Sequence, residues 1–130
     1  APPGPVEYPD QTAMVRRLHT SFSVAAALDA TVVRQQMAVL ATFLTVQVLD
    51  GVLTYWGVRE FGLHVEANSL VVTTIHMLGV APALLATKSF ACLCGLILHV
   101  TDSHRPLAVA AGSYIGLAVV PWLMLLAAVR

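Results

Sequence analysis

The chain has 130 residues, of which 58% are hydrophobic and 11% charged, and its formal net charge is zero. Soluble domains are nearer half apolar and a quarter charged, so this composition argues against a soluble enzyme and a disordered chain, and it predicts an integral membrane protein in a lipid bilayer. The neutral charge balance also excludes the broad basic surface that a nucleic-acid partner would need.

Two segments that do not span the membrane are predicted at the N-terminus. Residues 1–10 contain a run of prolines and predict an extended, proline-rich arm. Residues 11–34 predict an amphipathic helix, because apolar residues recur there at steps of three and four and form one stripe: Met14, Leu18, Phe22, Ala25, Leu28 and Val32. Such a helix lies in the membrane interface or docks on a partner subunit. The remaining residues, 35–130, form the predicted transmembrane domain.

The first predicted span covers residues 37–58, which carry a single charge and are long enough to cross a hydrocarbon core of about 30 Å. Tyr55 and Trp56, near its end, are typical of the aromatic belt at a membrane surface. A polar connection follows at residues 59–66, and Asn68 is suited to cap the next helix.

The next apolar stretch, residues 68–100, is too long for one ordinary span. Gly79 and Pro82 interrupt it, because proline disfavours the helical conformation in the residue before it. We therefore predict a short second helix at about 67–79 and a third at about 82–100. The second is barely long enough to cross, so it is either a tilted span or a re-entrant helix.

A last span is predicted at residues 107–129, with Pro121 as a candidate kink. The predicted fold is thus all-α: a polytopic membrane bundle of about four membrane helices, the second short, plus the N-terminal interfacial helix. Arg16, Arg17 and Arg34 predict a cytoplasmic N-terminus under the positive-inside rule, and we expect a prokaryotic cytoplasmic (inner) membrane. The side of the C-terminus depends on whether the second helix spans.

Two charges, Asp50 and Lys88, fall inside predicted spans, where each costs about 2.5–3.5 kcal/mol. Asp50 lies about 12 Å below the surface that carries the 59–66 connection. If the second and third helices both span, Val100 faces the same surface and Lys88 lies about 18 Å below it. A lysine side chain extends several ångströms along its helix, so the sequence predicts that the two charges pair.

Other polar side chains are expected beside this pair, because the helical spacing places them on the same face or at a similar depth. The predicted buried cluster comprises Asp50, Thr54, Thr73, His76 and Lys88, with Glu66 and Asn68 at its mouth. Three interpretations remain open: an ion pair that fixes helix pairing, a site for an ion, proton or polar solute, and pairing with a partner protein.

Of the five histidines, only His76 is placed deep enough to ligate a haem or a chlorophyll-type pigment. The others fall at predicted polar or interfacial positions, and no other cofactor is predicted. The sequence contains no zinc-protease, serine-hydrolase, P-loop or dinucleotide-binding motif and no recognisable nucleophile–base pair. We therefore predict no catalytic residue and no metal site.

The pattern Asp50-x3-Thr54, Gly62, Glu66-x-Asn68 and Lys88 resembles a family of small uncharacterised prokaryotic membrane proteins. That family is marked by an Asp-and-Thr helix, a Gly…Glu-x-Asn-Pro connection and a later intramembrane Lys. The resemblance covers about residues 45–100, and Ser69 stands where the family tends to carry proline. It implies a membrane helical fold and candidate residues, but no reaction.

Our first functional hypothesis is a non-catalytic accessory or structural subunit that packs against a larger membrane complex through residues 1–34 and its transmembrane faces. The alternative is a small transporter or channel that uses the intramembrane Asp50–Lys88 site. A second alternative is a haem- or pigment-binding membrane subunit that uses His76.

Overall fold

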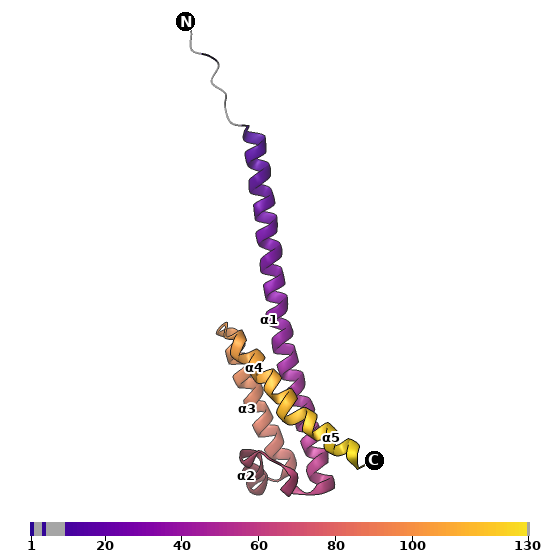
Figure 1. The fold of residues 1–130 in the computed structure, drawn as a ribbon. Coiled ribbons are helices and arrows are strands. Elements are labelled where there is room, and N and C mark those ends of the chain that lie inside the picture. Colours follow the sequence, from indigo (N-terminus) through magenta and orange to yellow (C-terminus); the bar gives the residue numbers. More distant parts are fainter. Residues whose placement is uncertain (2–3, 5–9, 130) are drawn as a thin grey trace. The chain divides into compact units, whose positions relative to one another are not determined.

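The computed structural model describes residues 1, 4 and 10–129, which divide into two compact units, residues 1–35 and 36–130. Most of the predicted proline-rich arm and the C-terminal Arg130 lie outside the described residues. The elements in chain order are α1 (Gln11–Phe61), the 3-10 helix η1 (Leu63–Val65), α2 (Ser69–Leu78), α3 (Val80–Val100), α4 (His104–Tyr114), the π-helix η2 (Ile115–Val119) and α5 (Val120–Ala128) (Figure 1). The described residues contain helices and no strand, so the predicted all-α fold is confirmed.

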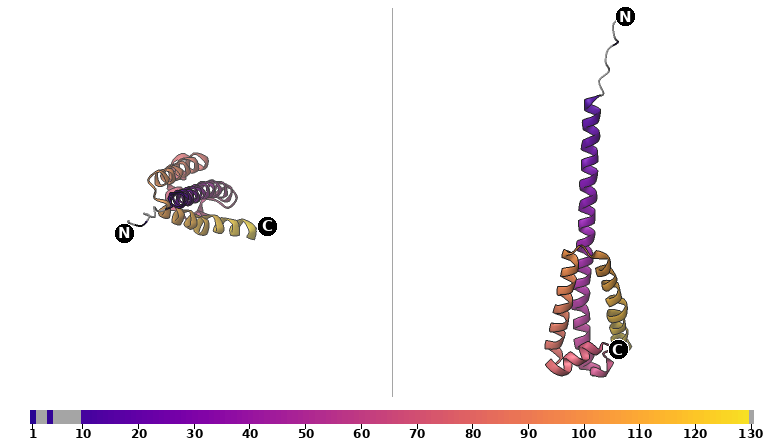
Figure 2. Two further views of the ribbon diagram at one scale, coloured as in Figure 1. Left: turned by 90° about the horizontal axis from the view of Figure 1, so that it is seen from above. Right: turned by 90° about the vertical axis from the view of Figure 1, so that its left-hand side faces the viewer.

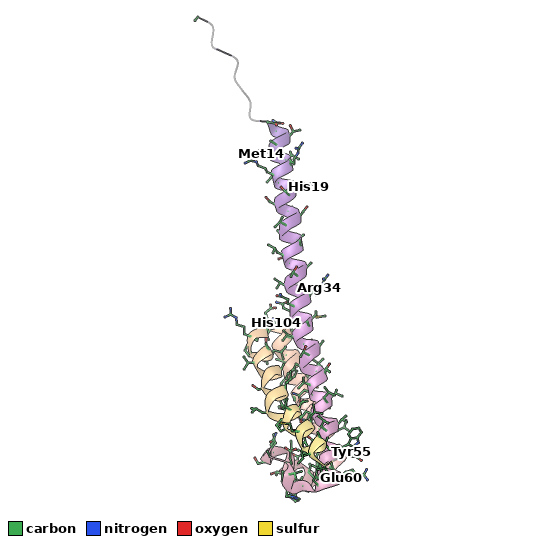
Figure 3. The ribbon with its side chains drawn as sticks, turned by 45° about the vertical axis from the view of Figure 1, so that its right-hand side comes forward. Met14, His19, Arg34, Tyr55, Glu60 and His104 are labelled. Atoms are coloured by element: carbon green, nitrogen blue, oxygen red, sulfur yellow. The ribbon has the colours of Figure 1, made fainter. Side chains whose placement is uncertain are left out.

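In the first unit, α1 begins after Asp10, whose carboxylate accepts a hydrogen bond from the backbone N–H of Thr12 at 3.0 Å and another from the Thr12 hydroxyl. This is the arrangement of a helix N-cap. Every residue from Gln11 to Gln35 is exposed. Figure 3 shows Met14, His19 and Arg34 projecting from this part of the helix. The predicted helix is present, but it continues without a break into the first predicted span as the single helix α1, and its position in a membrane interface remains a prediction.

Three helices are long and apolar enough to cross a membrane: Gln11–Phe61, Val80–Val100 and the continuous run His104–Ala128. Helix α2 has 10 residues and therefore rises about 15 Å, half of a hydrocarbon core. It corresponds to the short helix predicted near residues 67–79, and its length favours the re-entrant alternative over a tilted span.

Glycine and asparagine set the boundaries of α2. Gly62 and Gly79 have φ angles of 91° and 85°, which L side chains rarely adopt, so the chain turns at both ends of this segment. The Asn68 side chain caps the helix by accepting a hydrogen bond from the backbone N–H of Leu70 at 3.1 Å. Helix α3 begins at Val80, before Pro82, because a proline in the first turn removes only an N–H that has no partner within the helix.

Within residues 36–130, the last part of α1 lies between α3 on one side and α4–α5 on the other (Figure 2, right). Two glycines permit this packing. The Phe43 ring of α1 fills the space beside Gly95 of α3, and the Trp122 ring of α5 fills the space beside Gly57 of α1. A Cβ atom at either glycine would overlap the facing ring.

The π-helical segment η2 lies inside the last long helix, just before Pro121. Proline has no N–H and its ring clashes with the carbonyl group four residues earlier, here that of Leu117. A π-helical turn widens the backbone and relieves that clash, and such turns occur frequently at functional sites. The candidate kink at Pro121 is therefore a local change of helix type that begins directly after Tyr114.

Candidate functional site

Asp50 of α1 and Lys88 of α3 form a direct ion pair inside the helix bundle. The exposed fractions of their side chains are 6% for Asp50 and 16% for Lys88. The Thr54 hydroxyl, one turn after Asp50, donates a hydrogen bond of 3.4 Å to the Asp50 carboxylate. The structure thus brings together three of the five residues of the predicted cluster.

The two charges meet by a different route from the predicted one. Helix α2 is too short to cross a membrane. The end of α1 therefore lies near the beginning of α3, at Val80, and not near its end at Val100 (Figure 1). Measured from Phe61 and Val80, Asp50 and Lys88 lie about 16 Å and 12 Å along their helices. The side chains therefore reach each other easily.

Two further residues shape the surroundings of Lys88. A Cβ atom at Gly51 would lie 3.4 Å from Cγ of Lys88, an ordinary van der Waals contact, so the lysine stem packs directly beside α1 at this position. The Lys88 ammonium nitrogen lies 5.3 Å from the centre of the Tyr114 ring, within range of a cation–π interaction. The sequence interpretation missed Tyr114, a polar aromatic residue in the middle of an apolar span.

The ion pair lines a cavity of about 310 Å³, which we call the bundle cavity. Its polar and aromatic lining residues are Asp50, Thr54, Glu66, Asn68, Lys88, Ser113, Tyr114 and Trp122. Glu66 and Asn68, predicted at the mouth of the cluster, are therefore part of its wall. Oε1 of Glu66 accepts a hydrogen bond of 2.8 Å from the backbone N–H of Asn68, which positions the carboxylate at the start of α2.

The structure does not place Thr73 and His76 in this cluster. Both residues are exposed on α2, and neither lines the bundle cavity. The Thr73 hydroxyl donates to the carbonyl oxygen of Ser69 at 2.8 Å, within its own helix. The physical reason for the difference is the shortness of α2, since the predicted depth of both residues required a helix that crosses the membrane. Whether His76 ligates a haem or pigment stays a prediction.

Gln47 lies one turn before Asp50 on the same face of α1 and is fully buried. Neither its amide nitrogen nor its amide oxygen has a hydrogen-bond partner among the described residues. A buried polar group without a partner costs about 1–3 kcal/mol, so the Gln47 side chain lowers the stability of the folded protein. The polar face of α1 thus extends from Thr54 through Asp50 to Gln47.

His99 and His104 form a second polar contact, at the turn between α3 and α4. Nδ1 of His99 and Nε2 of His104 lie 3.0 Å apart, and the two rings are nearly perpendicular. The sequence interpretation treated the two histidines separately and missed this pair. Within residues 10–129, no group of three or more His, Cys, Asp or Glu side chains is arranged to hold a metal ion.

Comparison with known proteins places this bundle in a family. The model of a family described as Domain of unknown function (DUF5658) matches residues 41–128. The chain belongs to the DUF5658 family. No curated protein and no solved structure matches it.

The DUF5658 segment includes both members of the ion pair and every residue that lines the bundle cavity. It agrees with the expected resemblance to an uncharacterised family and extends it through the last long helix. Residues 11–35, the exposed part of α1, lie outside the DUF5658 match.

Proposed function

We propose that this DUF5658 protein binds a small polar solute within a membrane helix bundle and acts as a small transporter or channel. One observation carries the proposal: the buried Asp50–Lys88 pair forms part of the wall of a cavity of about 310 Å³. An ion pair that only fixes helix register needs no such space, and packed apolar side chains are often at least as stable as a buried pair.

Two further features support a binding role. Ligand sites are concave and mainly apolar, with a few polar groups that fix the orientation of the ligand, and the bundle cavity has this composition. The π-helical segment η2 supplies Leu117 and Ala118 to the same wall, and irregular helix turns are frequent at functional sites.

The proposed orientation follows from the number of long helices. Three crossings that start from a cytoplasmic N-terminus put the 62–79 segment, which includes the cavity-lining Glu66, on the opposite side of the membrane. Arg105 then lies on the cytoplasmic side with Arg16, Arg17 and Arg34, in agreement with the positive-inside rule. We accordingly propose a prokaryotic cytoplasmic membrane.

Solute flux into proteoliposomes tests this function. Cationic, anionic and neutral solutes are first screened for flux through the unsubstituted protein. For any solute that is transported, we expect the flux to be lost in Asp50→Asn and in Lys88→Met. Asp102→Asn, a neutralised exposed charge in the α3–α4 turn, is the matched control and should retain flux. Ala118→Phe fills the cavity without touching either charge and should also abolish flux. Flux that is unchanged in the Asp50, Lys88 and Ala118 variants would contradict the proposal.

A second candidate function is the accessory subunit of a larger membrane complex. The observation that favours it is the exposure of the whole helix from Gln11 to Gln35, including large apolar side chains such as Leu18 and Phe22. Purification from native membranes in a gentle detergent tests it. We expect co-purifying chains that are lost in Leu18→Ser/Phe22→Ser. A folded protein that migrates alone would count against the accessory role and favour an interfacial helix bound to lipid.

A further inference from the structure

The charges that line the bundle cavity do not balance. Asp50 and Glu66 are formally negative and Lys88 is formally positive, which leaves one uncompensated negative charge. Asp50 and Lys88 neutralise each other in their ion pair, so the uncompensated group is Glu66. In the part of the chain that the structure describes, no Lys or Arg side chain forms an ion pair with Glu66. A half-buried carboxylate in a mainly apolar cavity favours a cationic ligand.

The aromatic lining indicates which kind of cation. Two aromatic residues, Tyr114 and Trp122, are among the residues that line the cavity. Aromatic faces attract ammonium groups, and they favour substituted ammonium ions, whose hydration is weak enough to be replaced by a ring. Lys88 is an internal example, because its ammonium nitrogen already lies 5.3 Å from the centre of the Tyr114 ring.

The walls also disfavour other ligand classes. An anion would meet the Glu66 and Asp50 carboxylates, and the single lysine is already paired with Asp50. A small inorganic cation needs a close shell of ligands, and within residues 10–129 no three His, Cys, Asp or Glu side chains are grouped so as to hold a metal ion. A volume of about 310 Å³ lies at the lower end of ligand pockets and fits a small molecule or a headgroup.

We propose that the bundle cavity binds a substituted ammonium group, held by the Glu66 carboxylate and the rings of Tyr114 and Trp122. This inference rests on the proposed solute-binding function and names its ligand class. The group could belong to a free organic amine or to the headgroup of a lipid, because Glu66 lies in the connection between α1 and α2.

Tryptophan fluorescence provides a direct test, since the chain has only two tryptophans. In a Trp56→Phe background, Trp122 in the cavity wall is the single reporter. The protein is titrated in a maltoside detergent with tetramethylammonium and choline, and with 3,3-dimethylbutanol as the neutral molecule of matching shape. We expect a saturable fluorescence change with both ammonium ions and none with the neutral molecule.

A pair of glutamate variants identifies the binding group. Glu66→Gln should weaken ammonium binding by about tenfold or more, the loss of one charge-assisted contact. Glu60→Gln is the matched control, since Glu60 is exposed at the end of α1 and does not line the cavity (Figure 3). The titrations with ammonium ions and with the neutral molecule use neither glutamate variant. They therefore test whether the cavity prefers an ammonium group even if Glu66→Gln fails to fold.

Two bilayer compositions distinguish the sources of the ligand. If the ligand is a headgroup, discs of phosphatidylcholine change the Trp122 fluorescence relative to discs of phosphatidylglycerol, and Glu66→Gln removes the difference. If the ligand is a free amine, tetramethylammonium binds equally in both discs. Equal responses to ammonium and to the neutral molecule in every medium would overturn the proposed ligand class.

The two proposals fail in different ways. A solute of another class that requires Asp50 for its flux would leave the proposed function standing and overturn the ammonium ligand. Unchanged flux in Asp50→Asn, Lys88→Met and Ala118→Phe would instead remove the function itself.

Discussion

The indole ring of Trp122 lies against Gly57, in the space that a side chain at position 57 would occupy. Trp122 is buried, and its ring joins α5 to α1 at the end of the bundle that holds the cavity. A rigid aromatic ring cannot move aside as the end of a flexible side chain can. The close approach of these two helices therefore depends on the glycine.

We predict that Gly57→Ala lowers the free energy of unfolding by about 1–3 kcal/mol, the usual effect of overpacking a core. Thermal unfolding in detergent, followed by circular dichroism, measures it. Gly112→Ala is the matched control, because a Cβ atom at position 112 meets no atom within 4 Å. That substitution should be neutral or stabilising, since alanine favours helix over glycine. Equal destabilisation by the two variants would show that the Trp122 contact is not the cause.

Because Asp50 and Lys88 form an ion pair, we predict that substitutions at these two positions change the free energy of unfolding in a strongly non-additive way. Asp50→Leu and Lys88→Met should each destabilise the protein by about 3–5 kcal/mol, because each leaves the other charge buried without a partner. The double variant should cost less than either single one, since no buried charge remains. Unfolding measurements on all four proteins form the double-mutant cycle. Additive effects would mean that the two side chains do not pair in the membrane.

The first turn of α1 should respond to acid through Asp10. Hydrogen bonds from Thr12 lower the pKa of Asp10 below its ordinary range. Because the folded-state pKa is lowered, the cap is fully present above the pKa of the unfolded chain and is lost as the pH falls through the folded-state pKa. Amide hydrogen exchange at Thr12 and Met14 is followed by NMR. As the pH falls through the folded-state pKa of Asp10, we expect exchange at these two amides to be faster than the intrinsic pH dependence of amide exchange predicts.

Two variants check the role of Asp10. Asp10→Asn keeps a capping oxygen that does not titrate, so it should abolish the acid response. Asp29→Asn removes a carboxylate from the interior of the same helix and should leave the response intact. An acid response that persists in Asp10→Asn would assign it to another group.

The shortness of α2 predicts on which side of the membrane each connection lies. In a chain whose two cysteines are replaced by alanine, His64→Cys and Met77→Cys should react with an impermeant maleimide from the same side, because both residues are exposed and α2 does not cross. Thr101→Cys, beyond α3, should react only from the opposite side. Labelling of Met77→Cys from the side of Thr101→Cys would establish α2 as a crossing helix.

The sequence predicted the Asp50–Lys88 pair for a sound physical reason. Charges are so costly in apolar spans that two of opposite sign have few other partners. Thr54 was predictable from its helical spacing to Asp50, and Glu66 and Asn68 from their position in the polar connection. The depth of Lys88 was derived from the wrong helix end, because the sequence placed the end of α2 near Gly79 but left open whether so short a helix crosses the membrane.

The sequence could not predict the features that depend on distant contacts. Tyr114 reaches Lys88 because of how α4 packs on α1 and α3, which no local pattern encodes. The pairing of His99 with His104 depends on the geometry of one turn. The lack of a partner for Gln47 is likewise visible only once the surrounding helices are in place.

The position of Asp50 and Lys88 on different helices has a consequence for biosynthesis. The two residues are 38 positions apart in the chain, so at about 5–20 residues per second the ribosome adds Lys88 about 2–8 s after Asp50. During that interval α1 presents an unpaired aspartate to the insertion machinery. We therefore expect truncation of the nascent chain before Lys88 to leave α1 less firmly retained in the membrane than it is in the full chain.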